Sequence, residues 1–475
     1  MLFNSFDFLL FFPIVTILYY CFPYKLRWVL LLISSCYFYM AFVPIYILIL
    51  GATIVIDFFA GKYIEGSTGG KRKTFLIVSL VANIGVLAVF KYYNFIVDNA
   101  TFLCKELGFT SSLPYLNILL PIGLSFHTFQ AMSYTIEVYR GNQKAEKHFG
   151  IYALYVMFYP QLVAGPIERP QNLLFQFYKK HSLDYGNVVN GLKLMLAGVF
   201  KKVVIADRLA IYVNAAYNNQ ENHNGTTLLI ATIFFAFQIY CDFSGYSDMA
   251  IGAARVMGFD LMKNFNRPYF SKSVSEFWRR WHISLSTWFK DYLFIPLGGS
   301  RSKKMARVFF NLFFVFSISG LWHGASWTYV VWGALNGIYL IFGILITKYI
   351  FNKKDKQSKL WPIVSILFTF MLICLSWVFF RGNNIHDCIS IIHKILFSPG
   401  KLFTGDAGSR DFIYAVTFLI GLLMLEIVQE YKLFNGFSFY NNKSTLIRMT
   451  SYVVSILLIL MFGVFDGSQF IYFQF

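Results

Sequence analysis

The sequence predicts an all-α polytopic integral membrane protein, and three observations lead to that fold class. Of the 475 residues, 57% are hydrophobic and only 13% are charged, whereas a soluble domain carries about 25% charged residues. Apolar runs close to the length of a membrane span recur along the whole chain. Basic residues gather in the short breaks between these runs. Together these features exclude an ordinary soluble enzyme, a disordered protein and a coiled coil.

The apolar runs follow one another without a repeat of fixed period. A helix needs about 20 apolar residues to cross the hydrocarbon core, so we expect about 10–13 transmembrane or re-entrant helices in a single domain, residues 1–475. The first run lacks the basic flank and cleavage site of a signal peptide and should stay in the protein. Charged residues within run 188–215 indicate an interfacial or re-entrant helix. The runs occupy residues 8–22, 28–42, 44–60, 74–97, 116–139, 149–165, 188–215, 227–257, 305–322, 325–350, 360–380, 411–430 and 447–465.

Lysine and arginine number 41 and aspartate and glutamate 23, which gives a net charge of +18. Short basic loops beside membrane spans are what the positive-inside rule predicts, so Lys25, Arg27 and residues 71–73 should face the cytoplasm. We expect no nucleic-acid partner, because that function would need a soluble basic face. A positive cytoplasmic surface would instead attract anionic lipid headgroups or a phosphorylated cofactor.

The usual signatures of metal and nucleotide chemistry are missing from the sequence. The six cysteines are scattered without a C-x-x-C pair, and no two histidines stand at ligand spacing near a carboxylate. Neither a disulfide framework nor a metal site is therefore predicted. The G-x-S-x-G, P-loop and G-x-G-x-x-G fingerprints are also absent, so the sequence does not support a serine hydrolase or a nucleotide-binding enzyme.

Residues 258–302 interrupt the apolar pattern, because they are too polar to cross lipid and yet rich in large aromatic side chains. Helical spacing places the aromatic residues on one face of a predicted helix, which would lie at the interface or in a polar cavity between spans. Arg279 and Arg280 would point away from that face. The face consists of Trp278, Trp281, His282, Leu285, Trp288 and Phe289.

His323 is the outstanding candidate for chemistry, because it follows Trp322 between two strongly apolar runs. An ionisable residue at membrane depth indicates function by default. The residues leave an alternative open, a neutral histidine bonded to a backbone carbonyl within the bundle. Gly320 and Gly324 would let a substrate or another backbone approach closely. His282 is the second candidate, and its alternative is a packed interfacial histidine.

The long apolar run 227–257 holds a polar stretch that includes Asp242, Ser244 and Tyr246 beside Gly245. The first interpretation is a helix break at Gly245, with Asp and Ser acting as local caps. The second is a polar lining of an internal tunnel, since freed backbone groups within a membrane must be satisfied by protein or water.

These segments together resemble the membrane-bound O-acyltransferase superfamily, in particular the bacterial branch that holds the alginate O-acetylation and teichoic-acid D-alanine transfer proteins. The resemblance covers nearly the whole chain. Its specific elements are the two tryptophan-flanked histidines, in F-W-R-R-W-H-I-S and G-L-W-H-G. The matching segments are residues 120–130, 134–141, 164–167, 242–248, 277–288, 320–324 and 470–475.

The resemblance implies a ring of helices around a central tunnel, with 258–302 in the wall of its funnel. It makes His323 the catalytic histidine and His282 the second functional one. A neutral imidazole can take a hydroxyl proton while the oxygen attacks a thioester, and Asp242 or another polar group is expected to orient the ring. The tunnel-lining candidates are Asp242, Ser244, Tyr246, Trp281 and Trp322.

The substrates and location are likewise implied by the resemblance. Acetyl-CoA would be the cytoplasmic donor, with no permanently bound cofactor, and Arg279 and Arg280 are expected to contact it. The acceptor would be an extracytoplasmic polysaccharide, namely alginate, cellulose, peptidoglycan or another exopolysaccharide. The chain would lie in the bacterial inner membrane, among lipids, and work with a lipase-like partner of the SGNH type outside it.

The chain ends in F-I-Y-F-Q-F, within the tail 466–475, and Phe470, Tyr472 and Phe475 match an F-x-Y-x-x-F ending of this acyl-transfer group. The resemblance implies that Tyr472 carries the acyl group between donor and partner. The alternative is an aromatic anchor at the membrane interface.

Two other functions remain open from the sequence. One is D-alanyl transfer to teichoic acid from a carrier protein. The other is a transporter in which histidines near the midplane form a relay.

Overall fold

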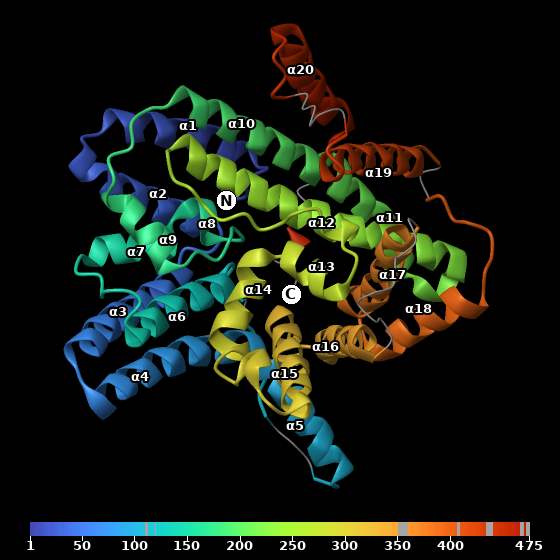
Figure 1. Cartoon of the computed structure of the whole chain (residues 1–475), viewed down its shortest axis with the longest axis horizontal. Helices are drawn as coiled ribbons and strands as arrows, with labels where there is room; N and C mark the ends of the chain where they lie inside the picture. Colours follow the sequence, from blue (N-terminus) through green and yellow to red (C-terminus); the bar gives the residue numbers. More distant parts are fainter. Residues whose placement is uncertain are drawn as a thin grey trace. The chain divides into compact units, whose positions relative to one another are not determined.

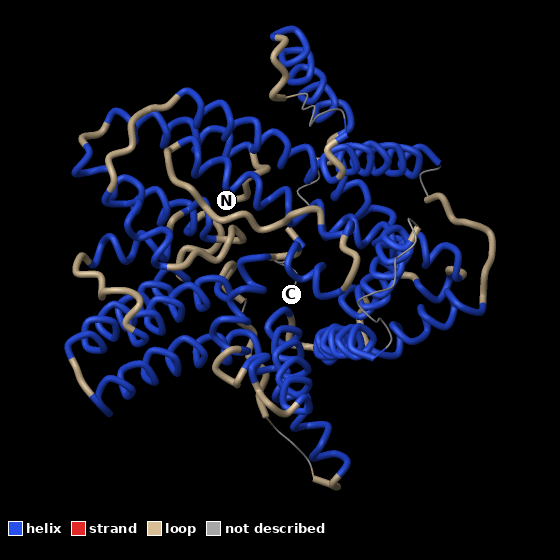
Figure 2. Tube along the Cα trace, viewed as in Figure 1, coloured by secondary structure: helices blue, strands red, loops and turns tan. Residues whose placement is uncertain are grey.

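A computed structural model describes residues 1–109, 113–118, 120–349, 360–405, 409–433, 440–465 and 470–471. Every regular element among these residues is a helix (Figures 1 and 2), which confirms the all-α prediction. Contacts divide the chain into two compact units, and each is described by itself. Unit 1 comprises Met1–Leu192 with Ala250–Met262, and unit 2 comprises Lys193–Met249 with Lys263–Phe475. The single-domain organisation stays a prediction.

Among the described residues, eight helices are long and apolar enough to cross a membrane, and the apolar helix Phe6–Cys21 is shorter. The chain is therefore a multi-pass membrane protein, as predicted. Several other apolar runs form helices below spanning length, including those at 28–42 and 149–165. The eight spans are Tyr46–Gly66, Gly69–Glu106, Gly225–Val256, Met305–His323, Trp327–Tyr349, Trp361–Arg381, Ser409–Glu430 and Thr445–Phe462.

Unit 1 holds the N-terminal helices, whose ends follow from local capping. The Ser5 hydroxyl accepts the Phe8 amide at 3.3 Å and starts α1. Gly123 and Gly141, with φ of 76° and 79°, flank α6 at positions that only glycine adopts readily. The helices are α1 Phe6–Cys21, α2 Arg27–Met40, α3 Tyr46–Gly66, α4 Gly69–Leu87, α5 Tyr93–Glu106, α6 Leu124–Arg140, α7 Phe149–Met157, α8 Tyr159–Leu162 and α9 Pro170–Leu173. Helix α10, Tyr185–Val199, passes from unit 1 into unit 2.

A buried polar network joins α3, α4 and α6 within unit 1. The Asp57 carboxylate accepts hydrogen bonds from the Ser79 hydroxyl at 2.6 Å and from the Asn83 amide at 2.9 Å. The Ser79 hydroxyl also lies 3.0 Å from the hydroxyl of Thr135. A carboxylate inside an apolar bundle is tolerated when its oxygens are hydrogen-bonded, so this network serves to hold three helices in register.

Unit 2 holds the remaining helices and both histidines singled out above. Two of its segments, Phe200–Ala206 and Lys290–Phe294, are π-helical, a form that is frequent at functional sites. The α-helices are α11 Asp207–Asn218, α13 Val274–Arg280, α14 Ile283–Phe289, α15 Met305–His323, α16 Trp327–Tyr349, α17 Trp361–Arg381, α18 Ile385–Phe397, α19 Ser409–Glu430 and α20 Thr445–Phe462. Helix α12, Gly225–Val256, contributes its residues up to Met249 to unit 2.

Helix α12 is continuous, so the predicted helix break at Gly245 is wrong. Gly245 instead lets another helix approach, because a Cβ at this position would lie 2.7 Å from the Gly198 carbonyl oxygen. Gly198 has the same relation to the Gly245 carbonyl, at 2.5 Å. The polar residues of this stretch therefore sit on an intact helix that packs closely against its neighbour.

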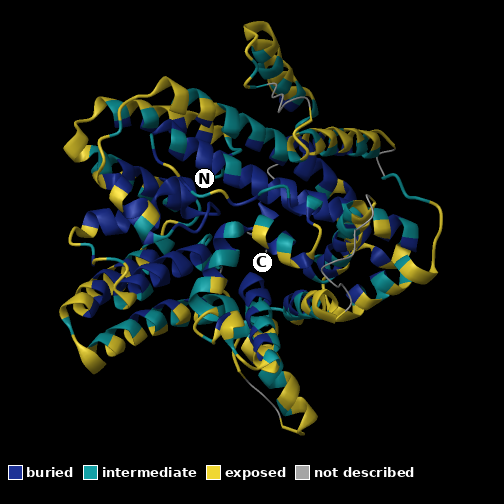
Figure 3. Cartoon of the chain, viewed as in Figure 1, coloured by how far each residue is buried: buried dark blue, intermediate teal, exposed yellow. Residues whose placement is uncertain are grey.

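The span α12 is also the most enclosed of the eight. About 83% of its apolar window is buried, compared with 6% for α20, and Figure 3 shows the same contrast in colour. The exposed apolar side chains of α20, such as Leu457 and Leu460, suit a lipid-facing surface. Helix α12 is thus the central element on which unit 2 builds its polar groups.

Candidate functional site

His323 is the last residue of α15 and is 4% exposed. Its ring is surrounded by aromatic side chains from three helices. Ring centroids lie 4.9 Å away for Trp322, 5.0 Å for Trp332 of α16 and 5.5 Å for Phe380 of α17. The His323 ring is therefore enclosed by aromatic side chains and almost fully shielded from solvent.

Glycines set the position of His323 by bringing α15 and α16 into backbone contact. A Cβ on Gly320 would lie 2.2 Å from the Tyr329 carbonyl oxygen, and one on Gly333 would lie 2.2 Å from that of Phe316. A Cβ on Gly324 would meet the Tyr329 ring at 2.1 Å. Of the two roles expected for Gly320 and Gly324, the structure shows close approach of another part of the chain.

His282 lies between two short helices, which corrects the prediction of a single aromatic helix. Helix α13 ends at Arg280 and α14 begins at Ile283, because His282 has a left-handed backbone with φ of 42°. The Asn264 carbonyl oxygen accepts the Ile283 amide at 2.9 Å and fixes this turn. A non-glycine residue in this region costs about 1–3 kcal/mol and is found most often at functional sites.

The contacts of Asn264 define the tautomer of His282. The Asn264 side-chain oxygen accepts the Ser284 backbone amide at 3.2 Å, which identifies it as the acceptor end of the amide group. His282 Nδ1 lies 3.1 Å from the same oxygen and must therefore donate. The basic lone pair of the neutral ring then belongs to Nε2. Burial lowers the pKa of His282 to about 3, so the ring is neutral at physiological pH.

The two histidines share one aromatic core, although they come from motifs 41 residues apart in the sequence. From His323 the contacts run through Trp332 to Trp377 at 5.7 Å, and from Trp377 to Trp281 at 5.2 Å. Trp281 lies 5.1 Å from Phe265, whose ring stacks on His282 at 6.4 Å. The sequence predicted both tryptophan-flanked histidines but not the tryptophans of α16 and α17 that connect them.

A polar cavity of about 490 Å³ opens in unit 2 beside this core. Its lining includes the Phe380 ring, which contacts His323, together with charged groups that are unusual at such burial. Lys202 Nζ lies 2.7 Å from Asp207 and 2.8 Å from Asp242, and all three side chains are at most 5% exposed. Arg381 completes the charged lining and donates to the Asn214 and Asn218 side chains.

Of the five residues expected to line a tunnel, Asp242 lines this cavity. Asp242 pairs with Lys202 and accepts a hydrogen bond from the Ile471 amide. Neither partner is the histidine ring that Asp242 was expected to orient. Ser244, Tyr246, Trp281 and Trp322 are buried in unit 2 but are not among the residues that line the cavity. Sequence reasoning missed Lys202, Asp207 and Arg381 as site residues. The signal for the first two was visible as charges inside an apolar run.

The two arginines that were predicted to contact acetyl-CoA lie in different surroundings. Arg280 forms ion pairs with Glu276 at 2.7 Å and with Glu430 at 2.8 Å. Arg279 is exposed. Tyr472 lies outside the described residues, which include its neighbours Phe470 and Ile471.

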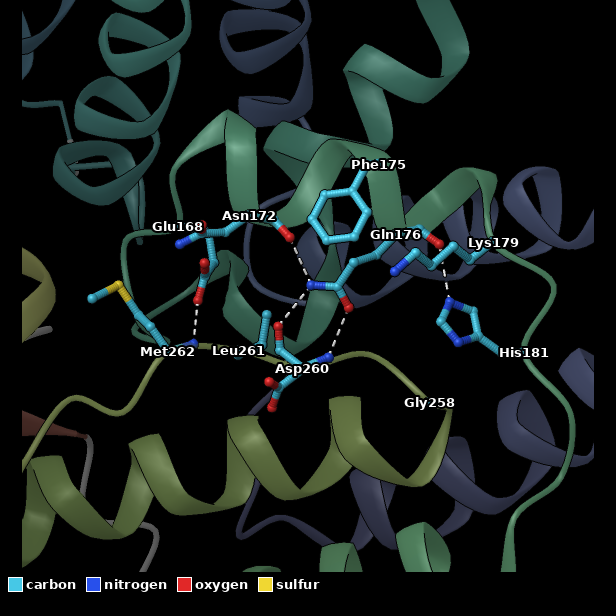
Figure 4. A pocket seen from close by; sticks show the side chains of 10 residues that line it. All are labelled: Glu168, Asn172, Phe175, Gln176, Lys179, His181, Gly258, Asp260, Leu261 and Met262. Carbon is cyan, nitrogen blue, oxygen red and sulfur yellow. Dashed lines mark hydrogen bonds between the residues drawn. The ribbon is translucent and has the colours of Figure 1, made fainter. Parts of the chain in front are cut away.

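A second cavity, of about 560 Å³, lies within unit 1 (Figure 4). Gln176 joins its two walls, because the amide group accepts from the Asp260 amide and donates to the Asp260 carbonyl, each at 2.8 Å. Glu168 accepts the Met262 amide at 2.5 Å. Burial raises the pKa of Glu168 to about 7. These hydrogen bonds connect the segment after α12 to the residues around α9. The cavity therefore lies where these two segments are joined.

The fold and the site define a multi-pass helical membrane protein that keeps a histidine away from water beside a polar cavity. Comparison with protein families identifies the class further: residues 148–380 match the membrane-bound O-acyltransferase family. The chain belongs to this family, as its motifs predicted, and is an O-acyltransferase. This membership favours acyl transfer over the transporter alternative.

Curated relatives place the chain in the predicted branch. A probable alginate O-acetylase of Pseudomonas syringae pv. tomato is 40% identical over 398 residues, which are 81% of this chain and 73% of the relative. A peptidoglycan O-acetyltransferase of Helicobacter pylori is 35% identical, over 76% of this chain and 72% of the relative. A teichoic acid D-alanyltransferase of Bacillus subtilis is 29% identical, over 57% of this chain and 71% of the relative.

Acidification is expected to destabilise the protein through His282. The folded ring has a pKa of about 3, whereas an unfolded histidine titrates near 6.5. Between these values the unfolded chain binds more protons, so the free energy of unfolding falls as the pH is lowered. The contribution between pH 6.5 and 5 is about 2 kcal/mol. In thermal unfolding in detergent, the unfolding temperature of the parent should fall more steeply with decreasing pH than that of His282→Gln. His386→Gln, at a histidine whose side chain is 93% exposed, should behave like the parent; equal slopes for the parent and His282→Gln would contradict the assignment.

His282→Ala is also expected to slow acyl transfer by about tenfold or more without abolishing it, because the ring is held at a fixed position in the aromatic core that encloses His323. Acyl transfer by purified variants in nanodiscs is the measurement. Transfer at the parent rate would leave His282 with a packing role alone.

Proposed function

We propose that this chain moves an acetyl group from cytoplasmic acetyl-CoA across the bacterial inner membrane for O-acetylation of an extracytoplasmic polysaccharide. The observation that supports the proposal is the position of His323, which is buried among aromatic rings, one of which, Phe380, also lines a polar cavity. The names of the alginate and peptidoglycan acetylating relatives support an acetyl group and a polysaccharide acceptor. The proposed acceptor is alginate, cellulose, peptidoglycan or another exopolysaccharide.

In the proposed reaction, His323 acts as general base. Its neutral ring takes the proton of an attacking hydroxyl while the oxygen adds to the thioester carbonyl. The carbon–sulfur bond breaks, a carbon–oxygen ester bond forms, and the proton passes to the sulfur of the departing CoA. General-base assistance of this kind is worth about 10²–10⁴-fold in rate.

The charge along the helices of unit 2 supports a reaction directed across the membrane. Basic residues cluster before and at the start of α15, where Lys303, Lys304 and Arg307 lie, and the positive-inside rule assigns that end to the cytoplasm. His323 stands at the opposite end of α15, and Arg381, at the corresponding end of α17, lines the cavity. On this basis His323 and Arg381 lie toward the extracytoplasmic ends of their helices.

Two further residues have roles in the proposed reaction, one in binding the acetyl donor and one in receiving the acetyl group. Arg279, which is exposed, is the better of the two predicted contacts for the CoA phosphates, since Arg280 is already paired with two glutamates. Tyr472 receives the acetyl group as an acyl-tyrosine and passes it to a lipase-like partner of the SGNH type. That partner completes transfer to the polymer outside the membrane.

D-alanyl transfer from a carrier protein is the second candidate, and the D-alanyltransferase relative is the observation in its favour. The discriminating experiment supplies purified protein in nanodiscs with acetyl-CoA or with a D-alanyl carrier protein. Release of free CoA supports the proposal. Turnover of the carrier protein alone would replace it with the D-alanyl function.

A further inference from the structure

The backbone at Ile471 is attached to a buried ionic cluster in unit 2. Lys202 lies between two carboxylates, 2.7 Å from Asp207 and 2.8 Å from Asp242, and these side chains are between 3% and 5% exposed. The second oxygen of Asp242 accepts the backbone amide of Ile471 at 2.8 Å. One ammonium group and two carboxylates leave a formal negative charge, and the Ile471 N–H is directed at it.

The residues before Ile471 are held by the same part of the chain. Arg208 donates to the Phe462 carbonyl at 2.6 Å, and the Val464 amide donates to the Val203 carbonyl at 2.9 Å. Phe470 is 1% exposed and stacks on Tyr246 of α12 at 4.7 Å. Phe462, Val464 and Phe470 are thus each held by residues of unit 2 that lie near the ionic cluster in sequence.

Burying such a cluster carries a large desolvation cost, and packing alone would not require it. Replacing buried ion pairs by apolar residues is often neutral or stabilising. A charged acceptor does, however, make a stronger hydrogen bond to a backbone amide than a neutral one does. The cluster is therefore suited to fixing one backbone group at a defined position.

That position lies at the wall of the cavity beside His323. Ile471, Asp242 and Lys202 all line the cavity, as does Phe380, whose ring centroid is 5.5 Å from that of His323. Ile471 directly precedes Tyr472 in the sequence. The hydrogen bond to Asp242 thus holds the backbone of the residue that directly precedes Tyr472 in the sequence.

We propose that Lys202 and Asp242 are positioning residues that hold the C-terminal tail at Ile471, so that Tyr472 is presented for acyl transfer. This inference rests on the proposed function, in which the Tyr472 hydroxyl attacks the acetyl thioester. Asp242 takes no part in bond making. It holds the tail through the Ile471 amide, and Lys202 orients its carboxylate through the ion pair.

The test compares full-length variants in nanodiscs by hydrogen exchange of the C-terminal peptide and by acetylation of Tyr472. Asp242→Ala removes the acceptor, while Lys202 keeps its pairing with Asp207 and so remains partnered. Exchange of the Ile471 amide should then rise about tenfold or more. Acetyl transfer to Tyr472 should slow about 100-fold at saturating acetyl-CoA, with the KM for acetyl-CoA unchanged. Asp242→Asn keeps the size of the side chain and an acceptor oxygen, so it should lie between the parent and Asp242→Ala in both measurements. If Asp242→Ala does not fold, Asp242→Asn is compared with the parent instead.

Asp248→Asn is the matched control. Asp248 lies on the same helix and pairs with Lys201 at 2.8 Å, so this variant also removes a carboxylate from an ion pair. Neither tail exchange nor acetylation should change in it. Unchanged tail exchange in Asp242→Ala, equal acceleration in Asp248→Asn, or acetylation at the parent rate with a loosened tail would each overturn the inference. Failure of the proposed function is seen separately, as a parent protein that never acetylates Tyr472.

Discussion

His323→Ala is expected to lower acyl transfer by about 10²–10⁴-fold while the protein still folds and inserts. The ring accepts the hydroxyl proton in the proposed reaction, and alanine cannot. Folding should survive, because His323 is the last residue of α15 and the α15–α16 contact depends on the glycines rather than on the imidazole. Release of CoA from acetyl-CoA by purified protein is the measurement, with elution from a size-exclusion column as the check on folding.

His323→Gln serves as the matched variant. Glutamine keeps hydrogen-bonding capacity in a side chain of similar reach but cannot act as a base at neutral pH. If proton acceptance is the role of His323, the glutamine and alanine variants lose the same activity. Substantial recovery with glutamine would instead indicate that His323 only orients the substrate.

Tyr472→Phe is expected to stop polymer acetylation altogether in cells that make the polysaccharide. The phenylalanine ring keeps the aromatic character of the tail, and the variant loses only the hydroxyl that would accept the acetyl group. A phenol of pKa near 10 is almost as good a leaving group as a thiol of pKa near 8.5, so an acetyl-tyrosine would retain most of the transfer potential of the thioester. Ester content of the secreted polymer is the measurement.

The two roles considered for Tyr472 separate in this experiment. A membrane-interface anchor tolerates phenylalanine, since the ring supplies most of the contact. An acyl carrier does not. Normal polymer acetylation by Tyr472→Phe would therefore leave only the anchoring role, whereas its loss, with the variant still inserted in the membrane, supports the carrier.

The general architecture was accessible from the sequence because hydropathy depends on local composition. The apolar runs predicted the spans, and the polar, aromatic stretch 258–302 was recognised as a segment that does not cross lipid. The helix periodicity failed at His282, however, because Asn264 supplies the carbonyl that stabilises its left-handed turn. Such a partner, 18 residues away, leaves no trace in the spacing of apolar residues.

The site was predicted only in part for a related physical reason. His323 and His282 are marked by adjacent tryptophans within short motifs. The Lys202–Asp242 pair and the Asp242–Ile471 hydrogen bond join residues that are 40 and 229 positions apart. A glycine that serves close packing, as Gly245 does, looks the same in sequence as one that ends a helix.

In the proposed reaction, this chain transfers an acetyl group from acetyl-CoA to its own tail with His323 as base. Mass spectrometry of the C-terminal peptide, after incubation of the purified chain with acetyl-CoA and no partner, tests it most directly. We expect one acetyl group on Tyr472 in the parent, with release of free CoA, and none in His323→Ala. A parent protein that releases no CoA and carries no acetyl group, or a His323→Ala variant acetylated to the parent level, would contradict it.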